Sequence, residues 1–169
     1  ILGATHPHLI AREGEKYRTS LEHMAEDLGV GEHVIFYNRF VSHEDLLEFI
    51  GATDIYLTPY LNEAQITSGA LAYAFGAGKA VVSTPYWHAK ELLDKDRGIL
   101  VPFRNSATIA TAVNDLLDHP ARMDEIRTNA YQSSRMTVWS AVARQYLDSF
   151  ERAKSDRRTV PAGVLAKGS

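Results

Sequence analysis

The stretch "TPYLNEAQITSGALAYAFGAGKAVVSTPYWHAKE" (Thr58–Glu91) decides the fold of this chain. An apolar strand beginning near Asp54 leads into it, a small-residue helix opens at Thr67–Gly69 and closes at Gly76–Gly78, and Lys79–Pro85 has the composition of the next strand. Backbone N–H groups at the start of a helix lack intrahelical partners and carry partial positive charge, so a phosphate can sit there without a basic side chain. We therefore expect a strand-loop-helix-strand unit with a nucleotide site at the start of its helix.

Upstream of this unit, the pattern predicts two further strand-and-helix pairs. Ile1–Pro7 has the character of a strand end and its loop, and Val34–Asn38 is rich in β-branched and aromatic residues, as strands are. Ser42, with Asp45 three positions later, is predicted to cap a helix. Between the strands, a helix is predicted from Gly14 to Leu28. Its apolar residues recur at helical spacing and are expected to be buried: Tyr17, Leu21, Met24 and Leu28.

Downstream, Gly98–Pro102 is predicted to be a strand and Ser106 to cap the helix after it. The buried stripe of that helix is expected to be Ile109, Val113, Leu116 and Leu117. A last long helix is predicted over Thr137–Lys154. The apolar residues that it is expected to bury are Trp139, Val142, Ala143, Tyr146, Leu147 and Phe150. Residues 155–169 are polar and contain Gly and Pro, which predicts a tail, so residues 1–154 form the expected domain.

Five short strands separated by helices predict an α/β fold with a Rossmann-like, doubly wound parallel sheet. In such sheets ligands bind at the carboxyl ends of the strands. The loops that follow Thr5, Asn38, Pro59 and Pro85 are therefore expected on one rim.

Composition narrows the function classes. The 169 residues carry a net charge of -3, which argues against a nucleic-acid partner because phosphate neutralisation by Lys and Arg dominates that binding. There is no cysteine, which excludes disulfides and thiolate catalysis. No apolar run reaches the length of a transmembrane segment, and no secretory leader is recognisable. These features predict a cytoplasmic location.

The central stretch also resembles the retaining GT-B glycosyltransferases of family 4, the glycosyl transferases of group 1. The resemblance rests on Pro59 at a strand end, Glu63, Ser68–Gly69, "GAGKA" (Gly76–Ala80) and "VVSTP" (Val81–Pro85), in the order of that family. It implies the C-terminal half of a GT-B fold, here lacking its first strand and helix. The implied activity is transfer of a sugar from a nucleoside-diphosphate sugar, such as a UDP- or GDP-sugar, without a metal or other cofactor.

The resemblance also implies roles for particular residues. Ser68, Gly69 and Ala70 would hold the diphosphate, and Glu63 would be the catalytic residue that faces the donor sugar. The turn formed by Arg39, Phe40 and Val41 would contact the base. Tyr73 stands where the family has a second Glu for the ribose, so it either offers a hydroxyl or packs in the core. The alternative is that Thr67–Gly69 is an ordinary helix cap and Glu63 a solvated loop acid.

Four further residues are candidates for the pocket rim: His6, Tyr86, Trp87 and His88. His6 and His8 lack a third metal ligand at a convincing spacing, so a metal is not expected and ordinary surface histidines are the alternative. Tyr86 and Trp87 stand where the family has a Gly-rich loop, and either cover the pocket or bury against another domain.

Three functional hypotheses follow. The first is the donor-binding domain of a hexosyltransferase whose N-terminal acceptor domain lies outside this sequence, so that this chain alone is inactive. The second is a catalytically inactive nucleotide-sensing or interaction domain, motivated by Tyr73 and the Tyr86–Trp87 pair. The third is half of a sugar-nucleotide epimerase. Exposed apolar surface left by a missing domain also predicts a homodimer of this chain.

Overall fold

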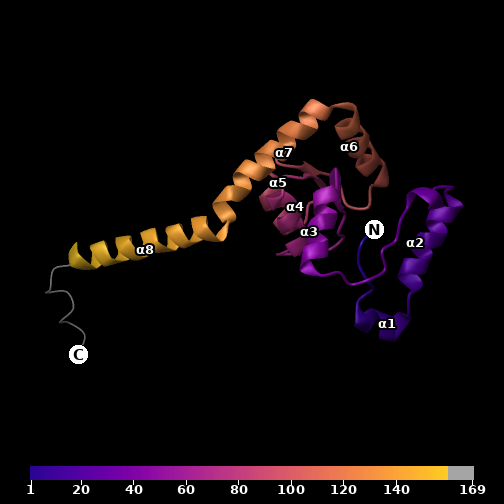
Figure 1. The fold of residues 1–169 in the computed structure, drawn as a ribbon, viewed down its shortest axis with the longest axis horizontal. Coiled ribbons are helices and arrows are strands. Elements are labelled where there is room, and N and C mark those ends of the chain that lie inside the picture. The colour runs from indigo at the N-terminus through magenta and orange to yellow at the C-terminus, as the bar shows by residue number, and fades with distance from the viewer. Residues whose placement is uncertain (160–169) are drawn as a thin grey trace. The chain divides into compact units, whose positions relative to one another are not determined.

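The computed structural model describes residues 1–159, which divide into two compact units, Ile1–Phe49 and Ile50 onward (Figure 1). The first contains α1 (Pro7–Glu13), α2 (Lys16–Asp27) and the short 3-10 helix η1 (Gly31–His33). The helix α3 (His43–Ala52) crosses the boundary between the units. Ser42 caps α3 as predicted, since its Oγ accepts the N–H of Asp45 at 3.0 Å.

The predicted strand at Val34–Asn38 is only a short paired segment. The N–H of Tyr37 donates to the carbonyl of Ile1 at 2.8 Å, and the N–H of Gly3 donates to the carbonyl of Tyr37 at 3.1 Å. One parallel bridge, between Leu2 and Tyr37, results. Ile35 is 62% exposed, so the apolar composition of this segment is not matched by burial, and the prediction of a buried strand is wrong.

The helix predicted from Gly14 to Leu28 is present as α2, and Gly29 ends it with a φ of 68°. Its stripe is not buried, however. Tyr17 is 75% exposed, Met24 55% and Leu28 70%, whereas Ala25 is the buried residue of this helix. The spacing identified an apolar face correctly, but the prediction that this face is buried is wrong for Tyr17, Met24 and Leu28.

The second unit alternates strands and helices. In chain order these are β1 (Ile55–Thr58), α4 (Gly69–Gly76), β2 (Ala80–Ser83), α5 (Trp87–Leu93), β3 (Ile99–Leu100), α6 (Ser106–Asp118), α7 (Pro120–Ser134), the 3-10 helix η2 (Arg135–Thr137) and α8 (Trp139–Thr159).

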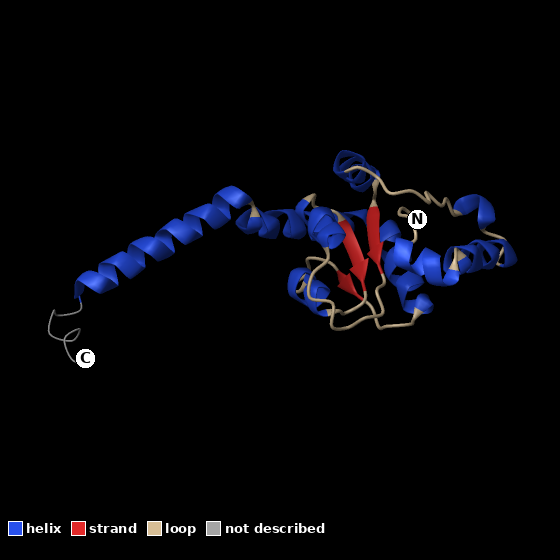
Figure 2. Cartoon of the chain, turned by 90° about the horizontal axis from the view of Figure 1, so that it is seen from below, coloured by secondary structure: helices blue, strands red, loops and turns tan. Residues whose placement is uncertain are grey.

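The three strands form a parallel sheet in the order β1-β2-β3, shown in red in Figure 2. Ile55 pairs with Ala80 and Thr58 with Ser83, so β1 and β2 end at the same level. Val82 pairs with Ile99 on the other side. Among residues 1–159 the regular sheet therefore has three strands where the sequence predicts five. The α/β class and the parallel pairing are confirmed.

Both faces of β2 are buried. Ala80 and Val82 pack with Ala112 and Leu116 of α6 and with Ile126 of α7. The alternate residues Val81 and Ser83 point to the opposite face and are also buried, at 0% and 1% exposure. A strand covered on both faces explains the continuous apolar run of this segment.

The start of α6 lies one residue from its predicted position. Asn105 is the cap, and its side-chain oxygen accepts the N–H of Thr108 at 3.0 Å, so Ser106 is the first helical residue. Leu116 is fully buried as predicted, and Ile109 and Val113 are partly buried against the core. Leu117 is 57% exposed, which corrects the prediction for that residue.

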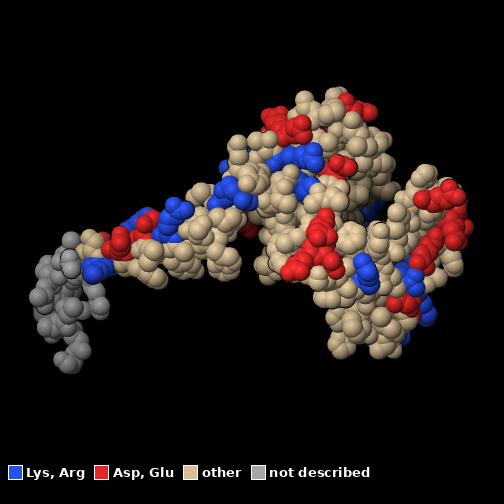
Figure 3. All heavy atoms as spheres, in the orientation of Figure 1, with Lys and Arg blue, Asp and Glu red and all other residues tan. Residues whose placement is uncertain are grey.

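The last helix, α8, is present but exposed. It runs to Thr159, past the predicted end at Lys154. Trp139 is 88% exposed and Phe150 64%, so the predicted burial of this stripe is wrong within the described residues. Side chains of both charge signs lie along the helix in Figure 3. The predicted tail is helical up to Thr159, and residues 160–169 lie outside the described part of the chain.

Candidate functional site

The carboxyl ends of β1 and β2 are tied together by buried hydroxyl groups. Ser83 Oγ donates to the carbonyl of Thr58 at 3.1 Å, and Thr58 Oγ1 lies 3.2 Å from the hydroxyl of Tyr86. Thr84 Oγ1 donates to the carbonyl of Tyr60. All three side chains, and Tyr86, are at most 2% exposed. Paired hydroxyls at this depth hold the strand ends, and hence the loop after β1, in one geometry.

Ser68 caps α4, which begins at Gly69, within the predicted helix start at Thr67–Gly69. Ser68 is 6% exposed, has extended backbone angles (φ -140°, ψ 109°), and its Oγ accepts the N–H of Leu71 at 3.3 Å. The N–H of Ala72 donates to the carbonyl of Ser68 at 3.1 Å, the first turn of the helix. Helix geometry leaves the N–H groups of Gly69 and Ala70 without intrahelical acceptors. These two donors are available to an anion.

Gly69 is exposed, and the fold does not require glycine there. A Cβ added at this position would meet nothing within 4 Å, and the φ of Gly69 lies outside the left-handed region. Gly78 is different, because its φ is +67° and a Cβ would lie 3.0 Å from Tyr131 Cβ. Gly78 therefore serves the fold by ending α4, whereas Gly69 leaves space in front of the helix.

The loop after β1 lies against the first turn of α5. The N–H of Trp87 donates to the carbonyl of Glu63 at 3.0 Å, and the N–H of His88 donates to that of Gln65 at 3.3 Å. The Glu63 carboxylate forms an ion pair with Lys90 at 2.7 Å, with side chains 58% and 47% exposed. Glu63 is thus a solvated acid with a cationic partner that the sequence analysis did not identify.

The aromatic candidates in the second unit separate into buried and open residues. Tyr86 is 0% exposed, with its ring 5.3 Å from that of Tyr60, so it belongs to the core and not to a pocket rim. Trp87 is 53% exposed and Tyr73 is 42% exposed. Tyr73 lies on α4, five positions after its Ser68 cap, and its partly open ring leaves both predicted roles in place.

Burial and two neighbouring tyrosines perturb Tyr56 in β1. Desolvation is the main cause that raises its pKa to about 12, and the nearby Tyr60 and Tyr86 phenols add to the shift. The phenol of Tyr56 is therefore a neutral group at physiological pH. Sequence reasoning missed this tyrosine cluster, because it depends on the pairing of the strands that place Tyr56 and Tyr86 near each other.

Among the candidates in the first unit, His6 has a local partner. His6 caps α1 by accepting the N–H of His8 at 3.3 Å, and the two imidazole rings stack at 5.2 Å. Arg39 is exposed, Phe40 is 94% exposed and Val41 is partly buried. A capping histidine explains His6 without a ligand.

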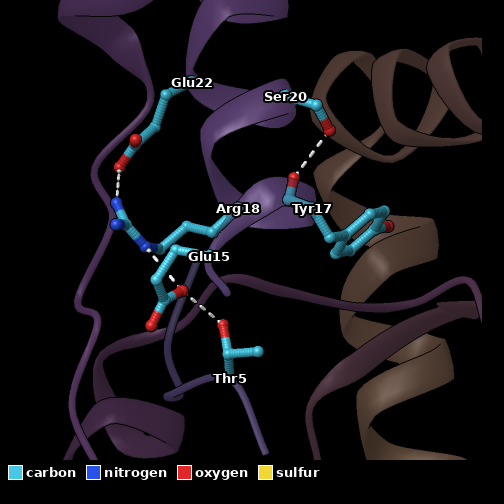
Figure 4. Close-up of polar contacts among 6 residues, drawn as sticks. All are labelled: Thr5, Glu15, Tyr17, Arg18, Ser20 and Glu22. Atoms are coloured by element: carbon cyan, nitrogen blue, oxygen red, sulfur yellow. Dashed lines mark hydrogen bonds and ion pairs between the residues drawn. The ribbon is translucent and has the colours of Figure 1, made fainter. Parts of the chain in front are cut away.

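The first unit also holds a polar network, drawn in Figure 4. Glu15 Oε2 accepts the hydroxyl of Thr5 at 2.7 Å and the Nε of Arg18 at 3.1 Å, and Arg18 also contacts Glu22. The hydrogen bond from Thr5 is the largest cause that lowers the pKa of Glu15, and the bond with Glu15 raises the pKa of Arg18. This network links the loop after Leu2 to α2.

The described residues contain neither a candidate metal site nor a candidate membrane-spanning helix. Within residues 1–159, no group of three or more His, Asp or Glu side chains is arranged to hold a metal ion. Over the same range, no helix combines the length and the apolar character needed to cross a membrane.

Comparison with known proteins places this geometry in a family. The sequence model of the family described as Glycosyl transferases group 1 matches residues 5–119. The D-inositol 3-phosphate glycosyltransferase 2 of Catenulispora acidiphila is 29% identical over 150 residues, which is 89% of this chain and 35% of that protein. A GDP-mannose-dependent alpha-(1-6)-phosphatidylinositol monomannoside mannosyltransferase of Mycolicibacterium smegmatis is 33% identical over 115 residues, covering 64% of this chain and 30% of that protein.

Solved structures agree on the fold. Sucrose-phosphate synthase from Thermosynechococcus elongatus superposes with a TM-score of 0.71 at 19% identity, covering 90% of this chain and 37% of that one. The C-terminal domain of a glycosyl transferase group 1 protein from Francisella tularensis gives a TM-score of 0.61 at 19% identity, covering 79% of this chain and 65% of that one.

The fold is therefore that of a GT-B glycosyltransferase domain, with the loop after β1 and the start of α4 at its candidate site. The chain belongs to the glycosyl transferases group 1 family. It spans about a third of the length of the curated relatives that it matches, at 35% of one and 30% of another.

Proposed function

We propose that this chain is the donor-binding domain of a hexosyltransferase that moves a sugar from a nucleoside-diphosphate sugar to a hydroxyl acceptor with retention. The observation that carries the proposal is the Ser68-capped start of α4, which presents two N–H donors beside an exposed Gly69 in the family-matched region. The leaving group of such a transfer is a nucleoside diphosphate, and its growing charge is stabilised by fixed N–H donors.

Further residues are proposed to take part in donor binding. Within the Ser68–Ala70 segment predicted to hold the diphosphate, the N–H groups of Gly69 and Ala70 bind it, because the Ser68 N–H is bonded to His88. Glu63 faces the donor sugar. The Arg39–Val41 turn contacts the base, and the Tyr73 hydroxyl takes the place of the family's second Glu at the ribose. No metal takes part in this proposal, because backbone donors supply the charge stabilisation. The name of the Mycolicibacterium relative refers to GDP-mannose, which makes GDP the first nucleotide to test beside UDP.

Calorimetry tests the proposal directly. The chain is titrated with UDP, GDP, ADP and their sugar conjugates, and the titrations are repeated with Gly69→Val and Glu63→Ala. We expect one diphosphate to bind and Gly69→Val to abolish binding, since the added side chain fills the space in front of the N–H donors. Glu63→Ala should weaken the sugar conjugate and leave the free diphosphate unaffected. Binding that is unchanged in Gly69→Val would contradict this site.

The acceptor side of the reaction is proposed to lie in another domain of the parent protein. The curated relatives are longer than this chain, which covers 35% of the Catenulispora protein. We therefore expect the isolated chain to bind nucleotide weakly and not to transfer sugar. Turnover by this chain alone would contradict that expectation. The proposed location of the protein is the cytoplasm. Apolar side chains exposed on α8 further predict a homodimer of the isolated chain, which light scattering would test.

One observation favours a second candidate, an inactive nucleotide-sensing domain. Tyr73 carries no carboxylate where the resemblance places the ribose contact, and the residue is 42% exposed. A full-length parent that binds nucleotide with Glu63 intact but neither transfers nor hydrolyses the sugar would support it. Tyr73→Glu should then restore ribose contact and tighten binding. Family membership favours transfer over epimerisation, and an assay for epimerised sugar nucleotide separates these two.

A further inference from the structure

The loop that carries Glu63 is held by the first turn of α5 through side chain as well as backbone. The N–H of Ser68 donates to Nδ1 of His88 at 2.9 Å, a partly buried bond between residues twenty positions apart. His88 also uses its own N–H to hold the carbonyl of Gln65 at 3.3 Å. One residue of α5 therefore contacts the loop at two points, just before the helix α4 begins.

The bond to Ser68 defines the state of the imidazole. Nδ1 accepts a hydrogen bond only when it carries no proton, so the ring is neutral with its proton on Nε2. The ring cannot accept from Ser68 in any other protonation state. The Ser68 N–H is therefore used within the protein and is not one of the donors left for a ligand.

The backbone and the side chain of Ser68 are both held by hydrogen bonds. Its N–H is held by His88 and its Oγ by the N–H of Leu71. The peptide that follows Ser68 carries the N–H of Gly69, and the direction of this N–H depends on the Ser68 backbone angles. Because Gly69 is exposed and a Cβ there would meet nothing within 4 Å, side-chain packing at this position does not hold the peptide in place.

We propose that His88 is a positioning residue of the donor site: its neutral ring holds Ser68 so that the N–H groups of Gly69 and Ala70 face the diphosphate of a nucleoside-diphosphate ligand. This inference rests on the proposed function. His88 need not touch the ligand, and it acts through the backbone of Ser68. His88 was predicted to lie on a pocket rim, and its bond to the N–H of Ser68 gives the ring a partner within the protein.

Three substitutions test the role of the ring nitrogen. His88→Asn places a side-chain oxygen near the position of Nδ1, and His88→Gln places one near the position of Nε2. His88→Ala provides neither. We expect His88→Asn to bind the preferred diphosphate, GDP or UDP, within about threefold of the parent chain, and the other two to bind about tenfold more weakly, the effect of losing one hydrogen bond. His119→Gln, the same change at the N-cap position of α7, where the ring contacts the carbonyl of Asp115, is the matched control and should bind normally.

Other binding results for the His88 variants would overturn the positioning role. Normal binding by His88→Gln with weak binding by His88→Asn would show that the ring contacts the ligand through Nε2, and would overturn the positioning role. Parent-like binding by all three variants would also overturn it. Thermal unfolding is measured for each variant, and an equal loss of Tm in all three would make His88 a residue of the fold instead.

A measurement without ligand separates this inference from the proposed function. Amide hydrogen exchange at Ser68 should be about tenfold faster in His88→Gln and His88→Ala and unchanged in His88→Asn, because only Asn keeps the acceptor. If the parent chain binds no diphosphate, the proposed function fails for this chain, whereas the exchange pattern still decides whether His88 holds Ser68. Unchanged exchange in His88→Ala would overturn the inference.

Discussion

The helices α4 and α8 have similar apolar side chains but differ in what covers them. In α4, Leu71 and Ala74 are 0% exposed and Phe75 is 3% exposed. In α8, Trp139, Tyr146 and Phe150 recur at helical spacing, yet each is more than 60% exposed. The α4 helix connects two paired strands and packs against the sheet, whereas the described residues leave the apolar face of α8 open. Periodicity thus identifies an apolar face, and tertiary contacts decide whether that face is a core or a surface.

Two leucine substitutions test the difference between α4 and α8, and one of them has the largest expected effect on stability. Leu71→Ala should lower the free energy of unfolding by about 2–5 kcal/mol, because it removes a fully buried side chain and leaves a cavity. Leu147→Ala removes the same atoms from a side chain that is 60% exposed, and should change it by less than about 0.5 kcal/mol. Urea unfolding measures both. A loss in Leu147→Ala as large as that in Leu71→Ala would show that α8 is covered in solution.

Two glycines at the ends of α4 give the next largest difference. Gly78→Ala should cost at least about 1–2 kcal/mol, since the left-handed φ of +67° strains any side chain. Crowding against Tyr131 Cβ, at 3.0 Å, adds to that cost. Gly69→Ala should leave stability unchanged, because its Cβ meets nothing within 4 Å. Thermal unfolding compares the two variants, and equal losses would contradict the distinct roles assigned to these glycines.

Helix caps give a smaller effect that tests the start of α4. Ser68→Ala removes the Oγ that accepts the Leu71 N–H and should cost about 1 kcal/mol. Ser106→Ala is its matched control, because Asn105 is the cap of α6 and Ser106 is already helical. The control should stay within about 0.5 kcal/mol of the parent chain. If Ser106→Ala proved the more costly of the two, the capping residue of α6 would need to be reassigned.

The titration of Tyr56 reports on the burial of its side chain, and it affects the stability of the chain only at high pH. Its pKa is raised from 10.0 to about 12, so between these values the unfolded chain loses the proton first and stability falls as pH rises. Below about pH 10 both states are protonated and the linkage vanishes. The absorbance of tyrosinate, taken as the difference between the parent chain and Tyr56→Phe, should titrate near 12. A midpoint near 10 would indicate that β1 is more open to water than the structure has it.

The candidate site was predictable where the chemistry is local. The start of α4 at Ser68–Gly69 and its end before Gly78 follow from residue type and spacing, and the structure places both accordingly. Tyr86 could not be assigned, because a tyrosine after a strand is compatible with either a rim or a core position. Its contact with Thr58, 3.2 Å away across the sheet, decided for the core. The ion pair of Glu63 with Lys90 was missed for the same reason, since it joins residues far apart in the sequence.

The sequence by itself determined the α/β class, the order of strands and helices around Thr58–Glu91, most helix ends and the membership of the family. These depend on interactions between neighbouring residues, such as caps, turns and side-chain periodicity. Only the tertiary structure decided which apolar faces are covered, which strands pair, and that His88 rather than a loop residue holds Ser68. Those outcomes depend on contacts between distant segments, whose geometry is set by packing and not by the local residue pattern.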